Sequence, residues 1–92
     1  MKIDKFYVRV VRDGDKYGMN DCLTHGGEPM AEFYDTRHGD GRGQFISRYY
    51  VETLLASEGG LMLMGGVPEW SLSGEDMKIV REFLTNEVKN DN

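Results

Sequence analysis

The fold class follows from the segment IDKFYVRVVR, residues 3–12, in which apolar and polar side chains alternate. Successive side chains of an extended strand point to opposite faces, so the alternation indicates a strand with one buried face. Three apolar residues then share one face and three polar or basic residues share the other, namely Phe6, Val8 and Val10 against Lys5, Tyr7 and Arg9. We expect a half-buried strand with a basic outer face.

Two further strand patterns follow the first, and each comes after a turn-like segment. Residues 17–23 form a weaker apolar run after Asp13-Gly14-Asp15, and residues 30–36 alternate again after the glycine-containing segment 24–29. Such turn residues favour tight connections, so the three runs predict an antiparallel meander. The apolar run 61–64 predicts a strand buried on both faces, with Met62 and Met64 in the core. Residues 67–72 would pair with it at a sheet edge, because Pro68 cannot donate to a central ladder.

Two helices are predicted, near residues 47–58 and 74–89. The second begins at a capping box from Ser73 to Asp76. Its apolar face recurs at helical spacing, with the residues Met77, Ile79, Val80, Phe83, Leu84 and Val88. For the first helix, Ser47 is the expected N-cap, Gly59 and Gly60 end it, and Arg48 would pair with Glu52 one turn on. The chain is therefore predicted to be one α+β domain over residues 1–92, with a small antiparallel β-sheet of four or five strands packed with two α-helices.

Composition narrows the class of protein. The chain has 92 residues, a formal net charge of −5 and a pI near 4.9. An acidic surface repels phosphate, which argues against binding free duplex DNA. No apolar run approaches the roughly 20 residues of a membrane span, so we expect no membrane partner. The single cysteine, Cys22, cannot form an internal disulfide, which fits a cytoplasmic location.

Metal or thiol chemistry is the main alternative to a binding protein. Cys22, His25 and His38 could supply three zinc ligands, or Cys22 with a histidine could act as a nucleophile. Asp13 and Asp15 resemble the opening of a calcium-binding loop, although the residue that should close it with a bidentate carboxylate is a threonine. A dependable fourth zinc ligand is also lacking. We therefore expect no metal, no cofactor and no catalytic activity, and keep a small metal-binding protein or enzyme as the alternative.

A cationic, aromatic segment at residues 37–50 is the favoured contact surface. Three arginines and Asp40 give this segment a formal charge of +2. Since the whole chain carries −5, the other residues together carry −7. Arginine forks suit phosphate or carboxylate, and tyrosine rings stack on bases or on protein. The candidate contact residues of this segment are Arg37, His38, Arg42, Arg48 and Tyr49. The alternative is a solvated loop with Tyr50 packed inward.

Acidic and aromatic residues elsewhere extend the candidate partner-binding set. Asp13, Asp15 and Asp21 could meet basic grooves built for nucleic acid. Trp70 could anchor an interface or close over the core beside Met77. A third possibility is a homodimeric structural protein that hides Leu61–Met64 or Trp70 in a self-interface.

In size, acidity and motif-poor α+β make-up, the whole chain from Met1 to Asn92 resembles phage-encoded anti-CRISPR proteins that act on type I surveillance complexes, type I-F among them. The resemblance implies a small phage or prophage inhibitor in the host cytoplasm. Such a protein would bind Cas-type subunits of a ribonucleoprotein complex, contact guide RNA and block target DNA. These inhibitors share no site residues, so the resemblance assigns none here.

Overall fold

The sheet that organises the chain has four antiparallel strands in the order β1-β2-β5-β6. A computed structural model describes residues 1–12, 16–17, 20–21, 27–39, 41 and 43–89, with side chains for all of these except 16–17 and 20–21. The strands of the sheet are β1 (Lys2–Ile3), β2 (Phe6–Val11), β5 (Met30–Asp35) and β6 (Gln44–Tyr50). Two small hairpins pair β3 (Lys16–Tyr17) with β4 (Asn20–Asp21) and β7 (Leu61–Met62) with β8 (Ser71–Leu72).

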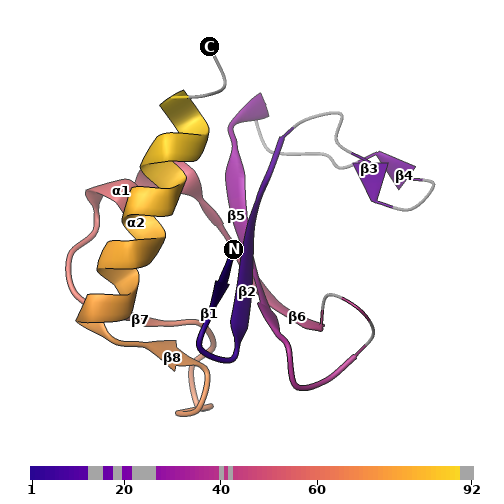
Figure 1. Cartoon of the computed structure of the whole chain (residues 1–92), viewed down its shortest axis with the longest axis vertical. Coiled ribbons are helices and arrows are strands. Elements are labelled where there is room, and N and C mark those ends of the chain that lie inside the picture. Colours follow the sequence, from indigo (N-terminus) through magenta and orange to yellow (C-terminus); the bar gives the residue numbers. More distant parts are fainter. Residues whose placement is uncertain (13–15, 18–19, 22–26, 40, 42, 90–92) are drawn as a thin grey trace.

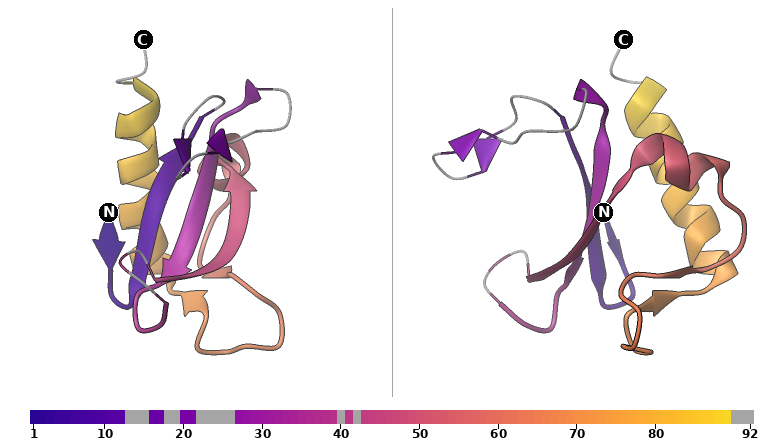
Figure 2. Two further views of the ribbon diagram at one scale, coloured as in Figure 1. Left: turned by 90° about the vertical axis from the view of Figure 1, so that its right-hand side faces the viewer. Right: turned by 180° about the vertical axis from the view of Figure 1, so that it is seen from behind.

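Both helices, α1 (Val51–Ala56) and α2 (Gly74–Lys89), belong to the layer on one face of this sheet. Figure 1 shows α2 along that face and the β3–β4 hairpin on the opposite side, and the rear view in Figure 2 agrees. The core between the layers contains Phe6, Val8, Phe33, Ile46, Leu54, Leu63, Met77, Val80 and Leu84. The predicted α+β class, with an antiparallel sheet and two helices, is confirmed.

Helix α2 follows its sequence pattern closely. The backbone amide of Asp76 donates to the Ser73 hydroxyl at 3.1 Å, as expected for an N-cap. Met77, Val80 and Leu84 are buried on the core side. The prediction that Ile79 belongs to this apolar face is wrong, because this residue is 51% exposed.

The first strand is interrupted where the sequence predicted continuity. Residues 3–12 form the end of β1, a two-residue turn at Asp4 and Lys5, and then β2, with Ile3 opposite Phe6. Asp4 has a φ of 52°, a left-handed conformation that aspartate tolerates better than most residues. The alternation within β2 is confirmed, since Phe6 and Val8 are buried in the core.

The predicted antiparallel meander is wrong in its second strand. Strand β2 pairs directly with β5, from Phe6 opposite Asp35 to Val11 opposite Met30. The segment predicted as a strand at 17–23 instead contributes to the separate β3–β4 hairpin. Strand β5 pairs along six residues of β2, whereas β3 and β4 are only two residues long, so β5 supplies β2 with a longer ladder.

The predicted helix 47–58 is the largest error. Its first residues belong to β6, which runs antiparallel to β5, and α1 begins only at Val51. Ser47 is therefore not an N-cap: it lies opposite Phe33, and its hydroxyl is buried without a partner among the described residues. The register shifts between Phe33 and Tyr34, so that Ile46 is an extra residue facing the core. This bulge breaks the strict alternation by which a strand is recognised in sequence.

The segment 61–64 is also less buried than predicted. Strand β7 ends at Met62, and only Leu63 of this segment is fully buried. Met62 is 54% exposed and Met64 42% exposed, so their assignment to the core is wrong. The pairing of this segment with the later one is confirmed in part, because Leu61 lies opposite Leu72 and the Leu63 amide donates to the Trp70 carbonyl at 2.8 Å.

Candidate functional site

The sheet face away from the helices carries three rows of side chains, set by the cross-strand register. We call this surface the outer face; each row takes one residue from β2, β5 and β6. The rows are Val11, Met30 and Tyr50, then Arg9, Glu32 and Arg48, then Tyr7, Tyr34 and Phe45. None of these nine residues belongs to the core on the helix side.

The middle row is an ion-paired cluster joined by one carboxylate. Arg9 binds Oε1 of Glu32 through Nε at 2.9 Å and Nη2 at 2.7 Å. Arg48 binds Oε2 of Glu32 through Nε at 2.9 Å and Nη2 at 2.5 Å. The Tyr34 hydroxyl donates to Oε1 at 2.7 Å. The Glu32 side chain is only 3% exposed, so its charge depends on these donors.

The titration of the row reflects these contacts. Burial alone would raise the pKa of Glu32, yet the hydrogen bonds from Tyr34, Arg48 and Arg9 outweigh it and hold the pKa below its ordinary value. Burial and the adjacent carboxylate raise the pKa of Tyr34 to about 12. At neutral pH Glu32 is therefore a carboxylate between two guanidinium groups, and Tyr34 of the neighbouring row is a neutral phenol.

The neighbouring row is aromatic and partly exposed. The Tyr34 ring lies 6.4 Å from that of Tyr7 and 5.7 Å from that of Phe45, the latter edge to face. Arg9 lies over the Tyr34 ring at 5.7 Å from its centre. Phe45 is 49% exposed and Tyr50, in the first row, is also exposed. Aromatic rings next to arginines form a surface able to stack on bases or on protein side chains.

A second carboxylate, Asp35 at the end of β5, anchors the loop that follows it. Among the described residues, Asp35 accepts four hydrogen bonds: from the Arg37 amide, Nε and Nη2 at 2.9, 3.0 and 2.7 Å, and from Trp70 Nε1 at 2.9 Å. Arg37 also reaches Glu69 at 3.3 Å. The Arg37 side chain, more than the backbone amide or Trp70, holds the pKa of Asp35 well below its ordinary value. The loop start and the Trp70 segment are thereby tied to the sheet.

Two of the predicted contact residues, Arg37 and Arg48, are ion-paired within the protein. Arg48 pairs with Glu32 across the sheet and not with Glu52 along a helix, and Arg37 pairs with Asp35. Residues 37–50 are therefore not an isolated cationic segment, because carboxylates of β5 lie against two of its arginines. His38 is exposed in the loop. Trp70 is partly buried and packs against the core, which agrees with the expectation that it closes over the core.

Tyr49 lies on the opposite side of the sheet from Arg48. Its ring packs at 5.9 Å from that of Phe33, and its hydroxyl donates to the Leu63 carbonyl at 3.1 Å. Asp13, Asp15, Cys22, His25 and Arg42 lie outside the described residues, and only the backbone of Asp21, in β4, is described. The sequence analysis did not select Glu32, Tyr34 or Phe45, since their shared face appears only once the strands are in register.

Neither the described side chains nor comparisons with known proteins assign a function to this chain. Among the described residues, no group of three His, Cys, Asp or Glu side chains is placed to hold a metal ion. Within that same part of the chain, neither helix has the length and apolar character needed to cross a membrane. Comparisons with protein-family models, with curated proteins and with solved structures found no match to this chain.

Acid should unfold the protein through Glu32 and Asp35. Both carboxylates have a lower pKa in the folded chain than their ordinary values of 4.5 and 3.8, so they bind protons more readily when unfolded. Their stabilising effect is present in full above about pH 5 and is lost as the pH falls through the folded values. Urea unfolding measured across this range should show the decline, and Asp35→Asn should make it shallower. An equal slope in that variant would contradict the role of Asp35.

Proposed function

We propose that this protein is a non-enzymatic binding module whose outer face attaches to a host nucleoprotein complex. The observation that carries the proposal is the pairing of an arginine row with an aromatic row on one sheet face, with Phe45, Arg48 and Tyr50 at its accessible β6 side. Arginine and aromatic side chains dominate binding energy at protein interfaces and stack on single-stranded nucleic acid.

The cross-strand contacts support recognition of a rigid partner. Glu32 holds Arg9 and Arg48 in a defined geometry, so less side-chain entropy is lost when the row meets a partner. The net charge of this row is +1, while the chain as a whole carries −5. A partner that combines RNA with basic protein grooves complements both charges. The resemblance to anti-CRISPR inhibitors makes a type I surveillance complex, with its Cas subunits and guide RNA, the first partner to test.

Truncating Phe45 should weaken binding without unfolding the chain. Phe45→Ala removes a half-exposed ring, and loss of an aromatic anchor at an interface weakens affinity by about tenfold or more. Ile79→Ala is the matched control, because Ile79 is equally exposed but lies on α2, in the layer on the other side of the sheet. Affinity for purified type I complexes, and for partners captured from host lysate, should be measured after melting temperatures are compared.

Equal affinities of Phe45→Ala, Ile79→Ala and the unmodified chain would exclude the outer face. Arg37→Ala, Arg42→Ala and Arg48→Ala form a second series for the predicted contacts of these arginines with RNA phosphate or acidic side chains. A loss confined to Arg37→Ala and Arg42→Ala would place the interface on the loop and not on the sheet.

A further inference from the structure

A pocket lies at the opposite layer of the molecule, between the two helices. Its volume is about 420 Å³, within the range of sites that take small ligands or protein side chains. It is lined by α1, by the end of α2 and by the two residues that precede β5: Val51, Glu52, Leu55, Ala56, Val88, Glu28 and Pro29. Five of these seven side chains are apolar, so the pocket favours an apolar occupant.

The walls of the pocket are held in place by contacts between the helices. Arg81 of α2 donates through Nε to the Leu54 carbonyl at 3.1 Å and through Nη2 to the Gly59 carbonyl at 2.9 Å. The Val51 amide donates to the Pro29 carbonyl at 3.1 Å, which joins the start of α1 to the segment before β5. The pocket is therefore formed before any ligand binds, which lowers the entropic cost of binding.

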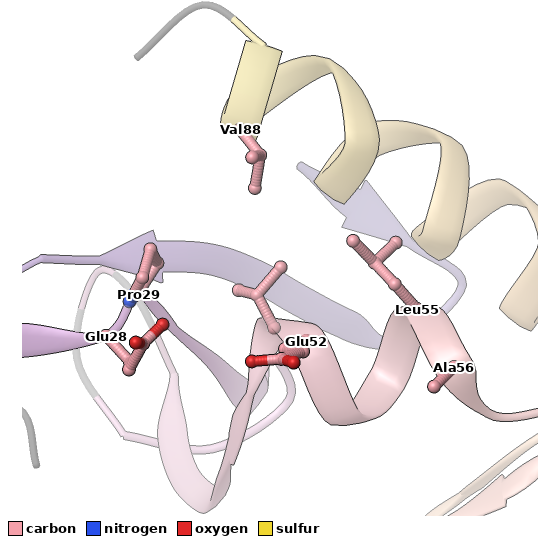
Figure 3. A pocket seen from close by; sticks show the side chains of 7 residues that line it. Glu28, Pro29, Glu52, Leu55, Ala56 and Val88 are labelled. Atoms are coloured by element: carbon pink, nitrogen blue, oxygen red, sulfur yellow. The ribbon is translucent and has the colours of Figure 1, made fainter. Parts of the chain in front are cut away.

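Two carboxylates flank the apolar walls. Figure 3 shows Leu55 and Val88 pointing into the space between the helices, with the Glu28 and Glu52 carboxylates beside it. Both glutamates are exposed, and neither carboxylate has an ion-pair partner among the described residues. An occupant that brings positive charge would gain two attractive contacts that the free protein does not make.

We infer that this pocket binds a protein segment in which an apolar side chain stands next to lysine or arginine. The apolar side chain enters between Leu55 and Val88, and the cation meets Glu28 and Glu52. The site lies on the helical layer, whereas the proposed function uses the outer face of the sheet, so the two can be tested separately. With both sites, the protein can bind one partner surface at the outer face and a second at this pocket.

The test uses two short capped peptides that share a central leucine and differ only in its neighbours, which are lysine in one and glutamate in the other. Titration into the full chain is followed by NMR of the Val51, Leu55 and Val88 methyl groups. The lysine peptide should shift these signals saturably, and the glutamate peptide should not. The double variant Glu28→Gln/Glu52→Gln should weaken the lysine peptide roughly three- to thirtyfold, because each exposed ion pair contributes only modestly.

Two further variants separate pocket binding from surface charge. Ala56→Phe fills the pocket from its exposed edge and should abolish the shifts at an unchanged melting temperature. Glu82→Gln, which removes an exposed charge of α2 outside the pocket, should bind as the unmodified chain does. Equal shifts from both peptides, no shifts from either, or the same shifts on raising the protein concentration alone would each overturn the inference. Phe45→Ala tests only the outer face. If this variant loses binding to a nucleoprotein complex, the peptide-induced shifts at the pocket should be unchanged.

Discussion

Glu32→Ala should lower the free energy of unfolding by about 3–5 kcal/mol, because it removes the carboxylate that joins two arginines across three strands. The cost is large because the Glu32 side chain is buried and its donors are arranged around it. A domain of this size has about 5–15 kcal/mol of stability in total. The variant should therefore unfold at a much lower urea concentration.

Two comparisons make this result specific to the row. Glu82→Ala removes an exposed carboxylate and should change stability by no more than about 0.5 kcal/mol. The quadruple variant Arg9→Met/Glu32→Leu/Tyr34→Phe/Arg48→Met replaces the charged row, and the Tyr34 hydroxyl that donates to Glu32, by apolar side chains of similar size. It should recover most of the lost stability, since buried ion pairs can be exchanged for apolar groups with little loss. If Glu32→Ala costs no more than Glu82→Ala, the three side chains do not form the row described here.

Gly43→Ala should lower the free energy of unfolding by about 3 kcal/mol or more, through backbone strain and steric overlap of the new Cβ atom with β5. Gly43 has a φ of 99°, which alanine adopts poorly. A Cβ atom at this position would also overlap the carbonyl oxygen of Asp35. The loop must then move away from the end of β5, where Asp35 binds Arg37 and Trp70. Urea unfolding measures the loss.

Gly41→Ala is the matched control in the same loop. Gly41 does not have a positive φ, and an added Cβ would meet no atom within 4 Å. Its stability should stay within about 0.5 kcal/mol of the unmodified chain. A penalty of equal size in both variants would mean that the loop needs general glycine flexibility, and not the close approach of Gly43 to Asp35.

The candidate site shows why its residues could not be selected from sequence. Arg9, Glu32 and Arg48 are separated by 23 and 16 residues, and they meet only because β2, β5 and β6 pair in one register. The sequence analysis selected Arg48 by charge and placed Arg9 only on the basic outer face of a strand, while Glu32 belonged to an ordinary alternating strand. Charge counted along the chain cannot reveal that a carboxylate of a neighbouring strand already lies against an arginine.

What the sequence by itself determined is local. The α+β class, strand β5 and helix α2 follow from periodicity and from the Ser73 cap, which depend on residues a few positions apart. Only the tertiary structure decided that residues 44–50 are a strand: β5 supplies the hydrogen-bond partners, and the bulge at Ile46 hides the alternation. The same long-range pairing built the outer face. Packing between distant segments outweighs local preference wherever that preference is weak, as it is between Ser47 and Val51.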